Sequence, residues 1–332
     1  MSIKSGNILR WGRIAAALAM WVTVTAGLTS YGMTFPRLAA WIGRVQFMPA
    51  AIAFAITVIA TWLIITLVFG RVYCSVGCPL GVWQDICSRL PRMRRHMPLH
   101  LRYHYSAPLT RLRNISLALT GVSIFLGIGV ATSHIDPWGI YSDLCTDVLK
   151  PLWGMAVNAF SAPPVMIASA SLTGIAISLT ITGVISWLAA RNGRTFCNSV
   201  CPVGTTLGYV AKYSIYHIDI NTDKCTQCRK CEHACKASCI DLNTHVVDSS
   251  RCVECFDCLP VCEDDAIHYT WSRHKLATPL MIKVGDLKPP GSGRFKLDGC
   301  TGCSGDQPIN RTNNHQDATI SRPTEPDHDR GN

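Results

Sequence analysis

Long uncharged apolar stretches alternate with short charged segments along the first part of the chain. Four stretches run from Ile14 to Pro36, from Val45 to Gly70, from Asn114 to Ser133 and from Val165 up to Arg191. A helix needs roughly 20 apolar residues to cross a bilayer, and each stretch reaches that length. The pattern predicts four transmembrane helices, in preference to unusually long buried helices of a water-soluble protein.

Composition and charge placement agree with a membrane protein. Of the 332 residues, 48% are hydrophobic and 16% are charged, whereas soluble domains carry about 25% charged residues. The net charge of +10 would suit nucleic acid, but the cations gather beside the apolar stretches. The segment between the second and third stretches contains one acid, Asp85, and these arginines: Arg71, Arg89, Arg92, Arg94, Arg95, Arg102, Arg111 and Arg113.

Charge asymmetry also predicts an orientation. The segment between the third and fourth stretches contains one basic residue, Lys150, and three acidic residues, Asp136, Asp143 and Asp147. Positively charged loops stay in the cytoplasm. We therefore expect a multi-pass protein of the bacterial inner membrane with both termini in the cytoplasm, and no nucleic-acid partner.

A cysteine motif follows the second and the fourth apolar stretch. The segments "GRVYCSVGCPLG" (70–81) and "GRTFCNSVCPVG" (193–204) share Gly-Arg, two cysteines four residues apart, and Pro-x-Gly. This indicates an internal duplication of two helices and one cysteine pair. The pairs are Cys74 with Cys78 and Cys197 with Cys201.

These four thiols suit several kinds of chemistry. Cysteines at i and i+4 lie on one face of a helix, which favours shared metal ligation. Redox-active thiols and simple helix capping are the alternatives, and the reducing cytoplasm disfavours a structural disulfide. The sequence predicts a joint site without deciding among these roles.

Two further cysteine runs follow the fourth stretch. "CTQCRKCEHAC" (225–235) and "CVECFDCLPVC" (252–262) both have the spacing Cys-x2-Cys-x2-Cys-x3-Cys. This spacing is typical of two [4Fe–4S] clusters whose fourth ligands are exchanged between the runs, and it disfavours zinc. One cluster would take Cys225, Cys228, Cys231 and Cys262; the other would take Cys252, Cys255, Cys258 and Cys235.

The flanks of these runs complete the expected domain organisation. "YHIDI" and "AIHYTW" look like strands, so the fold class we expect is an α-helical membrane protein with a small α+β ferredoxin-like cytoplasmic domain. The boundaries are 1–213 for the membrane domain, 214–271 for the ferredoxin-like domain and 272–332 for a polar, disordered tail. Lys236 and Glu263 replace the proline that usually follows the last cysteine, and Cys239, Cys87 and Cys145 are interpreted as packing thiols. The tail contains Cys300 and Cys303.

Together these motifs resemble the NapH family, the ferredoxin-type membrane subunits of periplasmic nitrate reductase systems. The resemblance covers residues 1 to about 271. It implies a quinol dehydrogenase that passes electrons from the membrane quinol pool toward a periplasmic reductase. It also implies a periplasmic iron–sulfur partner subunit and, in many systems, a tetrahaem cytochrome.

Related families leave an alternative function open. Copper-handling assembly proteins of the CcoG type, maturation proteins of the NosR type and ferredoxin-type proteins of methylamine utilisation share these cysteines. A non-catalytic assembly or copper-handling role is therefore the alternative to quinol oxidation. His96, His100 and His104 would serve copper, but the surrounding arginines oppose cation binding.

A quinol site leaves little trace in the sequence. The predicted spans contain no charged residue or histidine, which excludes an intramembrane relay of charged groups. His134 and Asp136, at the end of the third stretch beside Trp138, are the candidate proton-accepting residues. An ordinary turn capped by Asp136 is the alternative interpretation.

Overall fold

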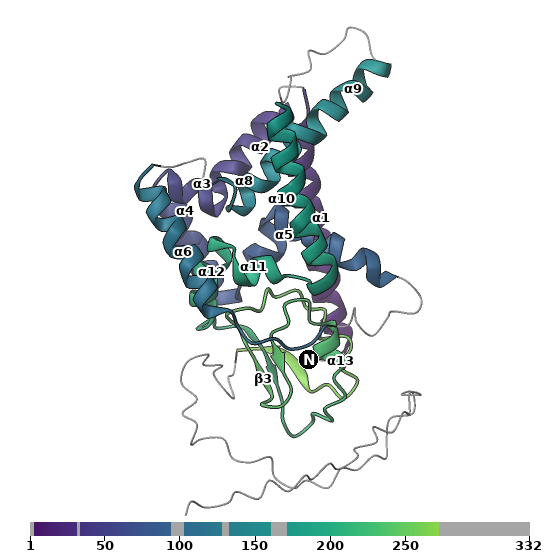
Figure 1. Ribbon diagram of the computed structural model, residues 1–332. Helices are drawn as coiled ribbons and strands as arrows, with labels where there is room; N and C mark the ends of the chain where they lie inside the picture. Colours follow the sequence, from purple (N-terminus) through teal and green to yellow (C-terminus); the bar gives the residue numbers. More distant parts are fainter. Residues whose placement is uncertain (1–2, 32–33, 94–102, 128–132, 161–170, 272–332) are drawn as a thin grey trace, which may run out of the picture. The chain divides into compact units, whose positions relative to one another are not determined.

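The computed structural model describes residues 3–31, 34–93, 103–127, 133–160 and 171–271. All of them belong to one compact unit, and most of the regular structure is helical (Figure 1). The boundary that we predict between residues 213 and 214 lies inside this unit. The predicted tail, 272–332, lies outside the described residues.

Helices form the larger part of the unit. Their bounds are α1 (Ile3–Thr29), α2 (Thr34–Val45), α3 (Phe47–Ile52), α4 (Ile56–Phe69), η1 (Tyr73–Gly77), α5 (Pro79–Arg89), η2 (Leu90–Met93), α6 (Thr110–Phe125), α8 (Pro137–Asp143), η4 (Leu144–Leu149), α9 (Lys150–Phe160), α10 (Leu172–Asn192), α11 (Thr195–Ser199) and α12 (Pro202–Ala211).

Two of these helices are long and apolar enough to cross a membrane by length and composition. They cover Gly6–Thr29 and Leu172–Asn192, which overlap the first and fourth predicted spans. The first span was expected to run from Ile14 to Pro36, but its helix starts a few turns earlier and ends at Thr29. Thr34–Val45 form a separate, strongly amphipathic helix, α2.

The second predicted span, Val45 to Gly70, is wrong as a single helix. Its chain forms α3, then a turn in which Phe54 has the left-handed φ of 51°, and then the 14-residue α4. The third span corresponds to α6, which has 16 residues and starts at Thr110 instead of Asn114. Apolarity alone could not locate the turn, because the residues on both sides of it are equally apolar.

Several helices bury small polar residues and expose large apolar ones. Small polar residues face inward on α4, α6 and α10, as Thr66, Thr120 and Thr182 do. Large apolar residues face outward on the same helices, and Phe125 is 91% exposed and Leu172 85% exposed. Exposed apolar surface of this extent indicates contact with an apolar environment.

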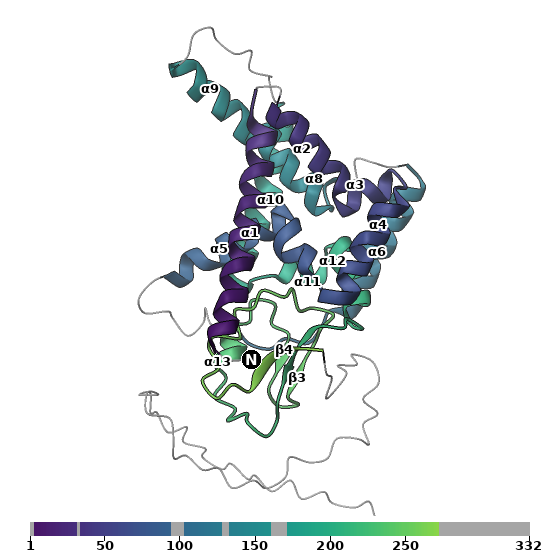
Figure 2. The same ribbon diagram turned by 180° about the vertical axis from the view of Figure 1, so that it is seen from behind.

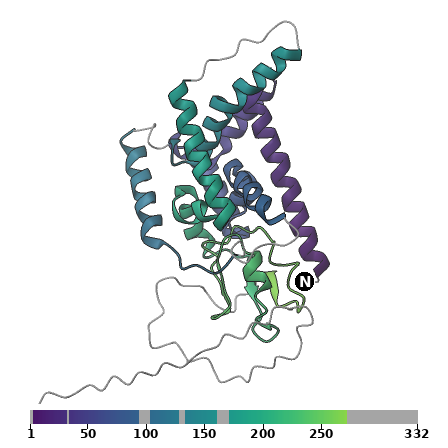
Figure 3. The same ribbon diagram turned by 45° about the vertical axis from the view of Figure 1, so that its right-hand side comes forward.

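The two halves of the repeat are interlocked. Helix α5, which follows the first cysteine pair, packs against α10 of the second half. Helix α12, which follows the second pair, packs against α4 of the first half and against α6. Figure 3 shows the same ribbon turned by 45°, with the teal α10 beside the blue α5. Each cysteine pair is therefore enclosed by elements of both halves.

The cysteine runs lie in a small part with short strands, visible from behind in Figure 2. Strand β1 (His217–Ile220) pairs antiparallel with β4 (Ile267–Thr270), and β2 (Ile240–Asp241) pairs with β3 (Val246–Val247). The strand-like flanks predicted from the sequence thus pair with each other, and this pairing joins the start and the end of this part. Helix α13 (Lys230–Ala234) holds the third cysteine of the first run.

Candidate functional site

The two cysteine runs have the same unusual backbone. Gln227 and Arg229 flank Cys228 with φ of 55° and 59°, and Glu254 and Phe256 flank Cys255 with φ of 48° and 59°. Left-handed backbone is rare for residues other than glycine and concentrates at functional sites. The repeated strain turns successive thiols toward a common point instead of along a helix.

The first set of predicted cluster ligands lies around one hollow. Cys225, Cys228, Cys231 and Cys262 line it together with apolar residues such as Ile220 and Leu242. Cys228 is exposed, whereas Cys231 is buried. The thiol that comes from the other run, Cys262, accepts a hydrogen bond from the Ala266 backbone N–H at 3.3 Å.

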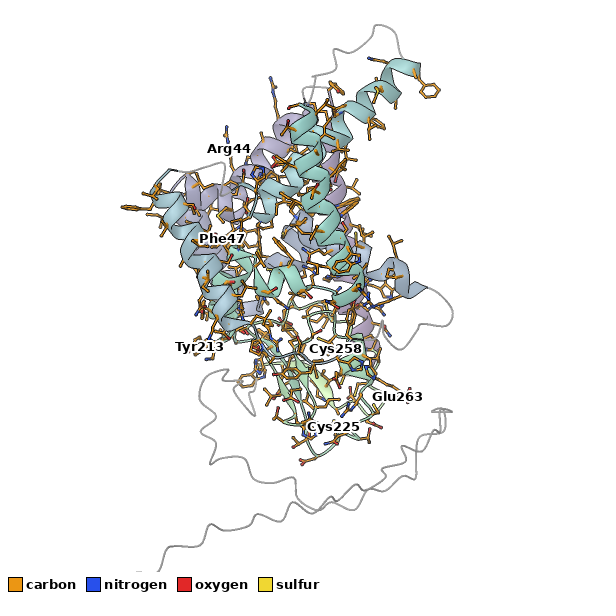
Figure 4. All side chains as sticks on the ribbon, in the orientation of Figure 1. Arg44, Phe47, Tyr213, Cys225, Cys258 and Glu263 are labelled. Atoms are coloured by element: carbon orange, nitrogen blue, oxygen red, sulfur yellow. The ribbon has the colours of Figure 1, made fainter. Side chains whose placement is uncertain are left out.

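The second set lies around a separate, buried hollow. Cys235, Cys252, Cys255 and Cys258 line it, and all four are buried. Cys239, which we expected to be a packing thiol, lines the same hollow. Figure 4 labels Cys258 in this set and Cys225 in the first.

The donor sets fit iron–sulfur clusters better than single ions. Within the described ranges, no three His, Cys, Asp or Glu side chains approach closely enough to hold one metal ion. A cubane cluster instead takes each of four thiolates on a different iron. Four thiols spread around each hollow match that requirement in number and in chemistry.

We expected the two cysteines of each repeated motif to lie on one face of a helix. The structure differs from this expectation. Cys74 lies in the π-helical turn η1, and Cys78 is the N-cap of α5, with Pro79 beginning the helix. Cys197 lies in α11, and Cys201 caps α12 ahead of Pro202. Each pair therefore spans a break between a short turn and the next helix.

The structure brings the four thiols of the repeat into one buried junction. Cys74, Cys78, Cys197 and Cys201 are each at most 4% exposed and belong to the same core. Burial raises the pKa of the Cys78 and Cys201 thiols. Cys74 and Cys197 raise the pKa of Cys78 further. The other three thiols of the repeat raise the pKa of Cys201 further. The two pairs therefore affect each other's pKa values.

Two buried arginines cross between the halves at this junction. Arg71 Nη2 lies 3.6 Å from Cys74 Sγ and donates to the Cys197 carbonyl at 3.3 Å. Arg194 Nη1 lies 4.0 Å from Cys197 Sγ and donates to the Cys74 carbonyl at 2.6 Å. Each arginine thus touches the first thiol of its own motif and the backbone of the other. We missed both residues, although Gly-Arg is repeated in the sequence.

The glycines of the repeated motifs make room for these crossings. A Cβ on Gly81 would lie 2.7 Å from Arg194 Nη1, and one on Gly204 would lie 2.7 Å from Arg71 Nη2. Both would also collide with the carbonyl of the first cysteine of their own motif. The Pro-x-Gly ending is therefore required by the arginine that arrives from the other half.

A buried network of ion pairs connects the junction to the second cysteine-lined hollow. Lys236 Nζ lies 2.9 Å from Asp85 Oδ2 and 3.0 Å from Asp257 Oδ2. Asp85, on α5, also pairs with Arg194 at 2.7 Å and with Arg13 of α1. Burial alone would raise the pKa of Asp85, but these cations hold it well below its usual range. Lys236 therefore has a defined role where ferredoxin motifs usually have proline.

The two quinol candidates have different surroundings. Asp136 is the buried N-cap of α8 and accepts the Gly139 N–H at 2.9 Å. Burial raises its pKa to about 7, and its charge contributes to raising the pKa of Tyr73 in η1. His134 Nδ1 lies 3.1 Å from the Ser133 hydroxyl. Trp138 lines a hollow of about 610 Å³ together with Gly43, Arg44 and Lys150.

The remaining sequence candidates are dispersed. His104 packs edge-on against the His233 ring, with centroids 5.0 Å apart. Cys145 is buried and Cys87 is half-buried, and neither lines one of the two cysteine-lined hollows. His96, His100, Cys300 and Cys303 lie outside the described residues.

Comparisons with known proteins add to this geometry. A family model described as a 4Fe-4S binding domain matches residues 49–98 and again residues 174–218. The matched segments contain the two Gly-Arg-…-Cys-Pro motifs, whereas the runs at 225–262 follow them. The chain therefore contains two copies of a segment found in 4Fe-4S binding proteins, which agrees with the predicted duplication.

Three curated proteins are similar to parts of the chain. Uncharacterized protein MJ0749 of Methanocaldococcus jannaschii is 37% identical over 75 residues, which cover 23% of this chain and 30% of that protein. Uncharacterized protein MJ0750 of the same organism is 24% identical, with 64% of this chain and 77% of that protein covered. "Putative electron transport protein YccM" of Escherichia coli K12 is 22% identical, with 64% and 56% covered. No solved structure matches.

Proposed function

We propose that this chain is a multi-pass membrane iron–sulfur protein that oxidises quinol and passes the electrons toward a periplasmic reductase. The observation that carries the proposal is the buried ion-pair connection from the four-thiol junction of the helices, through Asp85 and Lys236, to a cysteine-lined hollow. The name of the similar protein YccM and the two 4Fe-4S binding segments support electron transfer as its role.

The eight cysteines of the two runs would hold two [4Fe–4S] clusters, with the fourth ligand exchanged. Such clusters, when bound, take up and release single electrons. The protein's own contribution is to fix the thiols and to control access of water. It leaves Cys228 exposed on one set and buries all four thiols of the other. The buried set, joined to the helices by Lys236, would exchange electrons with the junction.

Four membrane spans and cytoplasmic termini are part of the proposal. The outward-facing apolar side chains of α1, α4, α6 and α10 support four lipid-facing helices. The arginine-rich segment between α4 and α6 supports its location in the cytoplasm. Helix α4, at about 1.5 Å per residue, is short for a bilayer, and α3 and α2 would complete its passage.

Quinol would bind at the hollow beside Trp138. Its walls are largely apolar, and Arg44 and Lys150 supply polar groups at its edge. Oxidation of quinol to quinone releases two electrons and two protons. Asp136, with a pKa raised to about 7 by burial, is suited to accept one of these protons near neutral pH. Burial raises the pKa of Tyr73, and the charges of Cys78 and Asp136 raise it further.

The resemblance to the NapH family supports more specific partners. We propose that the electrons reach a periplasmic iron–sulfur subunit and, where present, a tetrahaem cytochrome of a nitrate reductase system. The cysteine spacings and the duplicated motif are the residues on which this assignment rests.

Quinol-dependent reduction of the anaerobically purified full-length protein in lipid nanodiscs tests the proposal. We expect a reduced quinol analogue to generate the electron paramagnetic resonance signals of reduced clusters. Cys228→Ser and Cys255→Ser, each removing a ligand of one set, should lower the iron content, and the double variant should lower it further.

Two outcomes would contradict the proposal. Clusters that dithionite reduces but quinol does not would exclude quinol oxidation. Full iron content in the double variant would exclude the eight cysteines as ligands. Stoichiometric binding of Cu(I) by an iron-free protein would instead favour the copper-handling alternative.

A further inference from the structure

The two cysteine runs continue in register beyond their last cysteines. Ser238 lies three residues after Cys235 and has φ of 51°, and Asp265 lies three residues after Cys262 and has φ of 49°. The next residue donates its backbone N–H to the cysteine, as Ala266 does to Cys262 and Cys239 does to Cys235. Cys239 and Ala266 therefore occupy equivalent positions, one with a thiol and one with a methyl group.

The thiol at this position lies against two of the predicted ligands. Cys239 Sγ lies 3.5 Å from Cys235 Sγ and also hydrogen-bonds the Cys252 thiol. Cys239 is 1% exposed and lines the same hollow as the four cysteines of the buried set. That hollow has five sulfur atoms around it, whereas four line the exposed one.

A fifth thiol changes the electrostatics of a four-thiolate site. Ligand sulfurs are thiolates, which only accept hydrogen bonds, so an unligated thiol beside them must be the donor. Hydrogen bonds to the sulfurs are among the factors that set the reduction potential of a cluster. A donor stabilises the reduced, more negative state more than the oxidised state, and so it raises the potential.

We propose that Cys239 is a positioning residue of the buried set that donates its S–H to the thiolate of Cys235, 3.5 Å away. It thereby raises the reduction potential of that set. The inference rests on the proposed assignment of the eight cysteine ligands. Cys239 thus makes the buried set, next to the helices, a better electron acceptor than the same set would be with alanine at this position. Alanine is the residue at the equivalent position of the exposed set.

Reciprocal variants of the full-length protein in nanodiscs test the proposal, with redox titration followed by electron paramagnetic resonance. In Cys239→Ala we expect unchanged iron and sulfide content and a lower potential of the buried set. A net hydrogen-bond contribution corresponds to a roughly two- to tenfold fall in the reduced-to-oxidised ratio at a fixed potential. Cys239→Ser, which keeps a donor, should restore part of it. Ala266→Cys should raise the potential of the exposed set.

The outcomes separate this inference from the proposed function. Loss of iron in Cys239→Ala would identify Cys239 as a ligand and overturn the donor role. Full iron with unchanged potentials in Cys239→Ala would overturn it as well, while leaving the two clusters in place. Wild-type protein without iron at the eight cysteines would overturn the proposed function and, with it, the role of Cys239.

Discussion

The ammonium of Lys236 lies 2.9 Å from the Asp85 carboxylate, although one follows the last cysteine of a ferredoxin-type run and the other belongs to a helix of the bundle. Both side chains are less than 10% exposed. The same ammonium lies 3.0 Å from Asp257 of the other run. A single buried cation therefore pairs with a carboxylate of helix α5 and with a carboxylate of the second cysteine run.

Replacing Lys236 should destabilise the protein strongly. In Lys236→Met two buried carboxylates lose a cation, and breaking a buried ion pair costs on the order of 3 kcal/mol. Lys236→Pro, which restores the residue usual in such motifs, should cost at least as much. Thermal unfolding in detergent measures the effect. Lys230→Met is the matched control, because its partner Glu263 is 77% exposed and surface pairs contribute less than about 1 kcal/mol. Equal melting temperatures of Lys236→Met and Lys230→Met would contradict a stabilising role of the buried Lys236 ion pairs.

The glycines that end the repeated motifs should not tolerate alanine. Gly81→Ala and Gly204→Ala place a methyl group 2.7 Å from a guanidinium nitrogen and against a backbone carbonyl. Overpacking of this kind costs about 1–3 kcal/mol, and it displaces the arginine that touches Cys74 or Cys197. We expect lower melting temperatures in both variants. Gly183→Ala on α10, which meets nothing within 4 Å, is the control and should be neutral or stabilising.

Sequence patterns predicted the local grouping of the cysteines better than the contacts between distant segments. The Cys-x2-Cys-x2-Cys-x3-Cys spacing predicted two sets of four thiols, and the structure gathers each set around one hollow. The role of Lys236 could not be predicted, because its partner Asp85 is distant in the sequence and no local pattern relates them. The turn at Phe54 was equally invisible, because nothing in a uniformly apolar stretch distinguishes a left-handed residue from a helical one.

The pH dependence of stability should reveal Asp136. Its pKa is raised to about 7 by burial, so the folded state holds a proton that the unfolded chain releases near pH 4. Folding is therefore favoured at acidic pH, and the stability falls as the pH rises toward 7, by on the order of 4 kcal/mol. Asp136→Asn keeps a capping oxygen without a charge, so its melting temperature should depend less on pH between 5 and 8. Asp223→Asn, at an exposed carboxylate, is the control. An equal pH dependence in Asp136→Asn and wild type would exclude the buried carboxyl.

Reporter fusions should place the two ends of the proposed topology on opposite sides of the membrane. The arginine-rich segment 71–113 opposes translocation, so a fusion at Asn332 should report the cytoplasm. A fusion at Trp138, in the loop with three acids and one lysine, should report the periplasm. The same side for both fusions would mean that the number of spans is not four.

The four thiols of the junction should act as one unit. Arg71 and Arg194 each touch a thiol of one motif and the backbone of the other, so a change at either pair disturbs both. Residues that work together give losses that do not add. Cys74→Ser alone, Cys197→Ser alone and the quadruple variant should therefore depress quinol-dependent reduction of the clusters to a similar degree. Cys87 is a half-buried thiol outside the repeated motifs and the two runs. The control variant Cys87→Ser should therefore retain the wild-type rate. Iron bound by the eight cysteines of the runs should stay unchanged throughout, because the hollows have their own thiols.

Independent pairs would give losses that multiply, and packing thiols would give almost none. Either result, measured on the single and quadruple variants side by side, would exclude a shared site.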